Sequence, residues 1–296
     1  MKIQTNSLGG FRVTFTNPYS QMTVKELLET KLLIPRKIRH FLRTKKHLLV
    51  NQQVVTWQDL VTKGDEISLS FDPDDYPQKK IPFGNPHLVE CLYQDSHLIV
   101  VNKPEGMKTH GNEPNELALL NHVSAFVGQT CYIIHRLDME TSGAIIFAKN
   151  PFILPIMNRL LENREIGRNY WALIDGVIEN KDTVLQFPIG RHRHDRRKRL
   201  VDLKHGQKAI THVKRLKTYR HQFSLVDCSL KTGRTHQIRV HLSYIGHPIV
   251  GDPLYQQQTV SQRLMLHAHQ LYFKHPLTLE LIVVKAKSET FEKGLP

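Results

Sequence analysis

The chain has 296 residues, of which 40% are hydrophobic, and a formal net charge of +14. This length suffices for one large domain and a small one. No apolar run approaches a membrane span and the first residues lack a secretory signal, so we expect a cytoplasmic protein without a membrane segment. The charge favours a polyanionic partner, because counterions released from phosphates drive binding. Nucleic acid fits better than an anionic membrane, since no long basic amphipathic helix is evident.

Cysteine and histidine usage gives little sign of a metal centre. The cysteines are far apart and form no CxxC pair, so we interpret them as small buried apolar residues. Some histidines stand at alternate positions, but no carboxylate or cysteine cluster completes a site, so we predict no metal. The residues concerned are Cys91, Cys131, Cys228, His192, His194, His267 and His269.

The amino-terminal residues predict short strands and two small helices. Residues 10–16 alternate like a strand. Thr23 is followed three residues later by Glu26, which is the capping-box pattern, so a short helix should follow through Leu27 and Leu28. Further strands are expected at residues 47–50, at residues 54–55 and from Ile67 onward.

The second helix should begin near Pro35, a residue suited to the first helical position. Its apolar face holds Ile34, Ile38, Phe41 and Leu42, and its basic face holds Arg36, Arg39, His40 and Arg43. A charged face is usually only a solvated one. Because no acidic residue interrupts this face, its repulsion is uncompensated, and we predict a phosphate-binding surface.

Residues 72–86 contain four prolines without an apolar period and predict an extended linker, which would let two domains move. Strands dominate the rest of the chain. We expect strands at residues 88–93, 97–101, 132–134, 144–148, 168–173 and 223–226, and helices at residues 117–127 and 151–161.

The segment between the strands at 132–134 and 144–148 is unusual. It reads HRLDMETSG and carries Arg136, Asp138 and Glu140 between two apolar runs. A hairpin turn would be shorter and richer in Gly, Asn or Asp. Charged groups at the rim of a core need partners, and loops on rigid scaffolds often hold catalytic residues. From spacing alone, a solvated loop with local hydrogen bonds is an equal alternative.

Two later segments are also distinctive. Between Arg191 and Arg199 lie six Arg or Lys residues and one Asp, and Arg196 stands in the middle of this run. Such a run is usually mobile and solvated, but in a nucleic-acid-binding protein it favours a phosphate-binding loop. Residues 230–242, LKTGRTHQIRVHL, alternate apolar and polar at their end. We interpret this end as a strand whose polar face, including Arg239, is either an outer surface or the wall of a site.

HRLDMETSG resembles the signature loop of the RluA-type RNA pseudouridine synthases. Other segments resemble the same family in order: KPEGM, PIGR with the GQKAIT that follows, TGRTHQIRVH, GHPIVGDPLY and LMLHA. Residues 20–71 resemble the S-four-like RNA-binding domain. The resemblance implies an α+β protein with a mixed, mainly antiparallel catalytic sheet at residues 87–296, a linker at 72–86 and an RNA-binding domain at 1–71.

The resemblance also implies roles for single residues. Asp138 would be the catalytic carboxylate, and Arg239 would keep it ionised, because a partly buried Asp otherwise gains a proton. Tyr170 would stack on the uracil and could relay a proton, although without the resemblance a core aromatic is the better interpretation. Arg136 would fill the space left by the flipped uridine, and Leu266 would wall the pocket.

The implied reaction is the isomerisation of uridine in single-stranded or loop RNA, which needs no cofactor. Arg36, Arg39, Arg43, Arg191 and Arg196 would bind phosphates. The S-four-like module favours ribosomal RNA as the substrate and leaves transfer RNA open as the alternative. We expect the protein to be a monomer. Two alternatives remain. One is a catalytically silent RNA-binding or ribosome-assembly factor, and the other is a hydrolase of nucleosides or sugars, which would ordinarily use two carboxylates.

Overall fold

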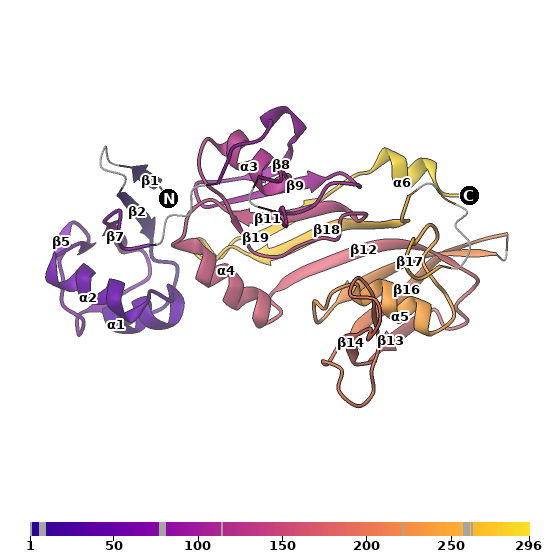
Figure 1. Ribbon diagram of the computed structural model, residues 1–296. Helices are drawn as coiled ribbons and strands as arrows, with labels where there is room; N and C mark the ends of the chain where they lie inside the picture. Colours follow the sequence, from indigo (N-terminus) through magenta and orange to yellow (C-terminus); the bar gives the residue numbers. More distant parts are fainter. Residues whose placement is uncertain are drawn as a thin grey trace.

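The computed structural model describes residues 2–5, 10–76, 81–113, 115–220, 222–256, 261 and 263–296. Figure 1 shows a small amino-terminal part beside a larger part that is built around one long sheet. Both parts are rich in antiparallel strands and contain few helices, which confirms the predicted α+β class.

The amino-terminal part has a five-stranded antiparallel sheet with helices over one face. In sheet order its strands are β1 (Lys2–Thr5), β2 (Phe11–Thr16), β7 (Glu66–Phe71), β4 (Leu48–Val50) and β5 (Gln53–Val54). The helical segments are α1 (Val24–Glu26), its continuation η1 (Leu27–Lys31) and α2 (Arg36–Thr44), and a small pair joins β3 (Met22–Thr23) to β6 (Leu60–Val61). The predicted cap is present, because the Thr23 hydroxyl accepts the Glu26 amide N–H at 3.1 Å.

The larger part contains a ten-stranded sheet. In order it runs through β13 (Asp182–Leu185), β16 (Thr211–Tyr219), β17 (Phe223–Leu230), β12 (Ile166–Asp175), β18 (Leu266–Lys274), β11 (Ser142–Ala148), β9 (Leu98–Lys103) and β8 (Glu90–Gln94). Beside this path, β10 (Tyr132–Ile133) pairs with β11 and β19 (Leu281–Lys285) with β18. The helices are η2 (Pro86–Leu88), α3 (Leu119–Val127), α4 (Ile153–Glu162), α5 (Gln237–Tyr244) and α6 (Glu289–Lys293).

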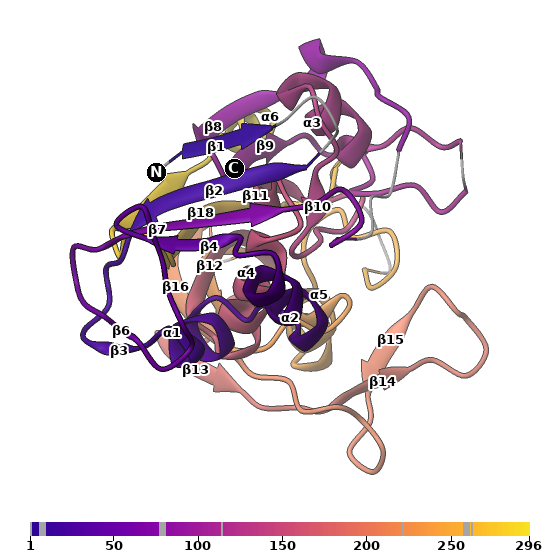
Figure 2. The same cartoon turned by 90° about the vertical axis from the view of Figure 1, so that its left-hand side faces the viewer.

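A separate hairpin, β14 (Ile189–Arg191) with β15 (Arg199–Val201), carries the basic run of residues 191–199. Figure 2 shows this basic hairpin projecting from the body of the molecule.

The signature loop, residues 135–143, ends where two central strands come very close. Gly143 of β11 lies beside Ala268 of β18, and these two strands run parallel at this point. Gly143 has φ +118°, and a Cβ there would lie 2.3 Å from the Ala268 carbonyl oxygen. Only glycine fits both the backbone angle and the contact. The loop is therefore anchored to β11, a strand whose residues are all buried.

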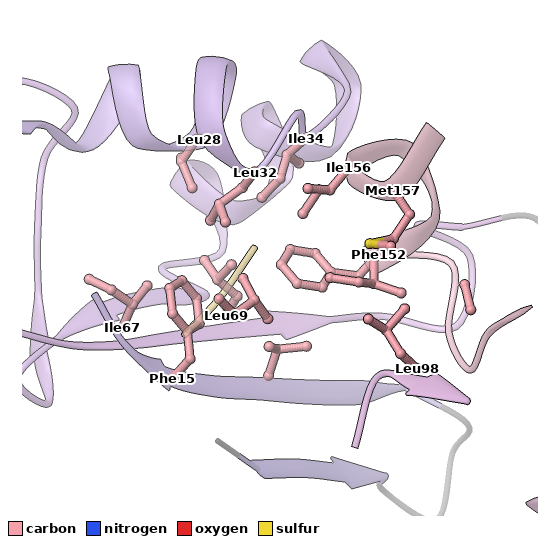
Figure 3. Close-up of a cluster of buried hydrophobic side chains, with 14 of the residues drawn as sticks. Phe15, Leu28, Leu32, Ile34, Ile67, Leu69, Leu98, Phe152, Ile156 and Met157 are labelled. Atoms are coloured by element: carbon pink, nitrogen blue, oxygen red, sulfur yellow. The ribbon is translucent and has the colours of Figure 1, made fainter. Parts of the chain in front are cut away.

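The two parts share one hydrophobic cluster. Figure 3 shows side chains from the amino-terminal sheet and helices meeting Leu98 and the side chains of α4. The rings of Phe71 and Phe152 lie 5.7 Å apart, and the Tyr19 hydroxyl donates to the Pro276 carbonyl at 2.5 Å. The relative motion expected from a proline-rich linker is therefore opposed by apolar burial between the parts.

The linker itself also has fixed contacts. Tyr76 is buried against Phe71, and farther along the Asn121 side chain donates to the Pro82 carbonyl at 2.7 Å. Residues 77–80 of the predicted linker lie outside the described part of the chain.

One predicted element is wrong. Residues 237–242 were interpreted as the end of a strand, but they begin helix α5. All six residues are buried. The alternation of apolar and polar residues therefore does not mark an inner and an outer face of a strand here. In the helix, Gln237 and His241 lie one turn apart, and both bind the Thr211 hydroxyl, each at 3.0 Å. Because these polar side chains are hydrogen-bonded, they can be buried in a helix although the sequence alternates like a strand.

Candidate active site

A cavity of about 470 Å³ opens between the signature loop, strand β12 and the start of helix α5. It is lined among others by Arg136, Asp138, Tyr170, His236, Arg239 and Leu266. Except for His236, the sequence singled out each of these residues as part of the site. They come from separate segments of the chain, and the sheet brings them together.

Arg239 is buried between two acidic residues. Its Nη1 lies 3.3 Å from Asp138 Oδ2, while its Nε and Nη2 donate to the two Asp252 oxygens at 2.8 Å each. Burial alone would lower the pKa of Arg239, but the hydrogen bonds and charge of Asp252 and the nearby Asp138 raise it overall. The guanidinium is therefore a fixed positive charge beside Asp138, and Glu140 lies 3.6 Å from the same Nη1.

Asp252 is a site residue that sequence reasoning missed. It is fully buried, and besides Arg239 it accepts the backbone N–H groups of Leu254 and Tyr255 at 2.9 and 3.2 Å. A buried carboxylate needs such partners. The segment GHPIVGDPLY drew attention only through its family resemblance, and its acidic residue among apolar neighbours was the available signal.

Tyr170 and Leu266 form an apolar side of the cavity. Tyr170 comes from β12 and Leu266 from β18, which are neighbouring strands. Burial raises the pKa of Tyr170, the charge of Arg168 opposes this rise, and that of Asp138 adds to it. Its phenol is therefore protonated near neutral pH and can act as a hydrogen-bond donor.

Two buried groups that sequence reasoning missed hold the signature loop in place. The Thr109 hydroxyl donates to the Leu137 carbonyl at 2.9 Å. Lys103 Nζ donates to the carbonyls of Met107 and Met139 at 2.6 and 3.0 Å. Burial lowers the pKa of Lys103 to about 8, against the charge of Asp138. The loop is therefore fixed through its own backbone, and Arg136 remains exposed at the cavity.

The ring of His135 is also buried in this loop. The Ile146 amide donates to His135 Nε2 at 3.4 Å, and burial lowers the pKa of this histidine to about 3. The ring is therefore neutral near pH 7 and serves as an acceptor at the base of the loop.

The basic residues singled out from sequence lie away from the cavity. Arg36 and Arg43 are exposed on α2, and Arg191 and Arg196 are exposed on the basic hairpin. Arg39 differs, because it forms an ion pair with Glu29 and is largely buried. The prediction that no acidic residue compensates the basic face of α2 is therefore wrong at Arg39, since its partner comes from the preceding helical segment.

Models of known protein families match most of these segments. The model described as RNA pseudouridylate synthase matches residues 97–244, which include the signature loop and all of α5. The model described as the RluD ribosomal pseudouridine synthase N-terminal domain matches residues 11–67. The chain belongs to the RNA pseudouridine synthase family. Members of this family are isomerases that convert uridine in RNA to pseudouridine, so this synthase is an enzyme that acts on RNA.

Individual pseudouridine synthases show the same relationship. The uncharacterized RNA pseudouridine synthase YhcT of Bacillus subtilis (strain 168) is 35% identical over 278 residues, which cover 91% of this chain and 90% of that one. The ribosomal large subunit pseudouridine synthase D of Neisseria meningitidis serogroup A is 34% identical, over 81% of this chain and 68% of that one. The structure of human RNA pseudouridylate synthase domain containing 1 aligns with a TM-score of 0.60 at 27% identity, over 69% of this chain and 85% of that one.

Two of the histidines that stand at alternate positions in the sequence, His267 and His269, contact protein side chains in this synthase. His267 Nδ1 lies 2.9 Å from the Ser142 hydroxyl, and His269 Nε2 lies 3.2 Å from Asp227 Oδ1.

Within the described ranges, the chain has no helix of the length and apolarity that a membrane crossing requires.

Proposed function

We propose that this synthase isomerises uridines in ribosomal RNA and that Asp138 is its catalytic carboxylate. The observation that carries the proposal is the contact of Asp138 with the buried, doubly held Arg239 at one side of a cavity of about 470 Å³. The ribosomal substrate is supported by the match of residues 11–67 to the RluD amino-terminal domain and by relatives named ribosomal large subunit pseudouridine synthase. Transfer RNA is the alternative substrate.

The proposed chemistry begins with an extruded uridine in the cavity. Isomerisation cleaves the bond between the uracil nitrogen and the ribose and rejoins the base through its carbon 5, without redox change or net hydrolysis. It therefore requires no cofactor in principle. Asp138 would act at the sugar or at the base, or remove a sugar proton, and each route uses the same carboxylate. Arg239 would keep this carboxylate ionised.

The remaining residues would hold the substrate. Tyr170 would stack on the uracil while it is detached, and Leu266 would exclude water on the same side. Arg136, exposed at the cavity mouth, would occupy the place of the flipped nucleotide, since a guanidinium can stack and bind phosphate together. Arg36, Arg43, Arg191 and Arg196 would bind phosphates outside the cavity.

The test is release of tritium from RNA labelled at carbon 5 of uracil. Wild-type protein should release tritium into water without an added cofactor, and Asp138→Asn, which keeps the shape of the side chain, should release none. Circular dichroism and urea denaturation verify that the variant folds. Substrates would be ribosomal and transfer RNA transcripts, tested separately.

Each alternative has its own outcome. RNA binding without tritium release from any transcript would indicate a silent binding factor. Free uracil in the supernatant would indicate a hydrolase, for which Glu140 could supply a second carboxylate. Equal release by wild type and Asp138→Asn would remove Asp138 from the reaction.

Three further properties remain predictions: a monomeric state, a cytoplasmic location, and the division into residues 1–71, 72–86 and 87–296. Sedimentation of the full chain would test the first of them.

A further inference from the structure

His236 occupies an unusual backbone position at the edge of the cavity. It precedes helix α5 with φ 58° and ψ 21°, which is the left-handed region. Residues other than glycine adopt this region rarely, and such positions gather at functional sites when neighbouring groups hold them there. The ring of His236 is hydrogen-bonded at Nδ1, and a carboxylate lies near its Nε2.

On the Nδ1 edge the partner is Tyr255. The Tyr255 hydroxyl oxygen lies 2.9 Å from His236 Nδ1 and accepts the Arg199 backbone N–H at 2.8 Å. A phenol has one proton to donate. The Arg199 amide fills one lone pair of the oxygen and leaves the hydroxyl proton free to point at Nδ1. With that orientation Nδ1 is an acceptor, and the ring proton of neutral His236 resides on Nε2.

On the Nε2 edge lies the proposed catalytic carboxylate. His236 Nε2 is 3.7 Å from Asp138 Oδ2, which is slightly too long for a hydrogen bond. Contacts of this kind often tighten when substrate binds. The charged groups that act on the ring are Asp138, Arg239, Asp252 and Arg199. Burial lowers the pKa of His236, Asp138 opposes this effect, and the ring is neutral near pH 7.

The other end of this chain of contacts is the basic hairpin. Arg199 is the first residue of β15 and pairs with Arg191 of β14. If the hairpin shifts when it binds an RNA phosphate backbone, the Arg199 N–H group that donates to the Tyr255 hydroxyl therefore moves with it.

We propose that Arg199, Tyr255 and His236 form a hydrogen-bond relay through which RNA bound at the basic hairpin orients the Asp138 carboxylate. In this relay His236 is a positioning residue. It presents Nε2–H to Asp138 Oδ2, and Tyr255 keeps the ring in the tautomer that makes this possible. Arg239 supplies the charge beside the carboxylate, and His236 supplies its direction. This inference rests on the proposed role of Asp138.

The first experiment measures the tautomer without any reaction. In wild-type protein labelled with ¹⁵N-histidine, the two-bond imidazole correlation spectrum near pH 7 should show His236 protonated at Nε2 only. The signal is assigned by its loss in His236→Gln. In Tyr255→Phe the ring should sample both tautomers. Protonation at Nδ1 in the wild type would overturn the relay, even if the enzyme isomerises uridine.

The second experiment measures single-turnover tritium release. Tyr255→Phe keeps the ring over which Arg239 lies, and should slow the step about tenfold, the size of one hydrogen bond, while the Kd for RNA stays within about twofold. His236→Gln, whose amide can donate near the Nε2 position, should retain more activity than His236→Ala.

Matched controls separate this role from a general loss of packing. Tyr272→Phe and His87→Gln make the same chemical changes at residues that do not line the cavity, and should leave the rate unchanged. A wild-type rate in both Tyr255→Phe and His236→Ala, or a Tyr255→Phe defect confined to RNA affinity, would contradict the relay. If wild type releases no tritium from any RNA, the proposed function fails instead, and the tautomer spectrum still decides the relay.

Discussion

Helix α2 and the basic hairpin look alike in sequence but differ in how much of their charge is available. On α2, Arg39 is paired with Glu29, and next to the helix Lys45 is paired with Asp72. In the hairpin, Arg197 pairs with Asp195, whereas the guanidinium groups of the other arginines from 191 to 196 are exposed. The hairpin therefore offers more uncompensated charge to an RNA backbone.

The charge density along a chain is therefore not the charge that a partner meets. The acidic partners in and next to α2 come from a preceding helical segment and from Asp72, the residue after β7, so the sequence of the helix does not reveal them. Arg239 is the extreme case of compensation, because two carboxylates hold it inside the protein.

Removing the buried guanidinium of Arg239 should have the strongest effect on stability. Arg239→Met should lower the free energy of unfolding by about 3–5 kcal/mol, because it leaves the carboxylate of Asp252 buried without its partner. Urea denaturation followed by circular dichroism measures the loss. Arg197→Met removes an exposed pair and is the matched control, for which no measurable change is expected. Similar losses in the two variants would contradict the difference between buried and exposed pairs.

Replacing Arg191, Arg193 and Arg196 of the basic hairpin by Gln should weaken RNA binding more than the other surface variants do. The slope of log K against log salt should fall by about 2, since each contact to a single-stranded phosphate contributes about 0.7. Filter binding of an RNA transcript over a salt series measures both quantities. An unchanged slope would remove the hairpin from the RNA path.

The equivalent replacement on α2 should have a smaller effect. With Arg36, Arg39 and Arg43 changed to Gln, the slope should fall by about 1.4, because Arg39 is already neutralised by Glu29 and two free cations remain to be lost. The same salt series applies. A fall equal to that of the hairpin variant would mean that Glu29 releases Arg39 when RNA binds.

Removing the acidic partner of Arg39 should have the smallest effect, and in the opposite direction. Glu29→Gln frees Arg39, so RNA binding should tighten about twofold and the salt slope should steepen by up to about 0.7. Glu26→Gln, one turn earlier on the same helical segment, removes an equal charge without touching Arg39 and serves as the control. Weaker binding in Glu29→Gln would indicate that the ion pair fixes α2 in place.

Local sequence signals predicted much of the fold. The Thr23 cap, the helix before Gly128 and the buried strand β11 follow from residue patterns that act within a few positions. Helix α5 did not follow, because its first six residues, 237–242, are all buried although half of them are polar, so polarity does not mark an outer face there. Its polar residues are hydrogen-bonded to Thr211 of β16 and to Asp252, both of which lie outside the helix.

For the site, the residue pattern was enough to identify the carboxylate segment and the residues around it that resemble the family. Which polar groups meet became visible only in the folded chain: Asp252 behind Arg239, Glu29 on Arg39, and Tyr255 between the hairpin and His236. The difference is one of range. Backbone preferences act over neighbouring residues, whereas charge compensation depends on which strands the sheet places side by side.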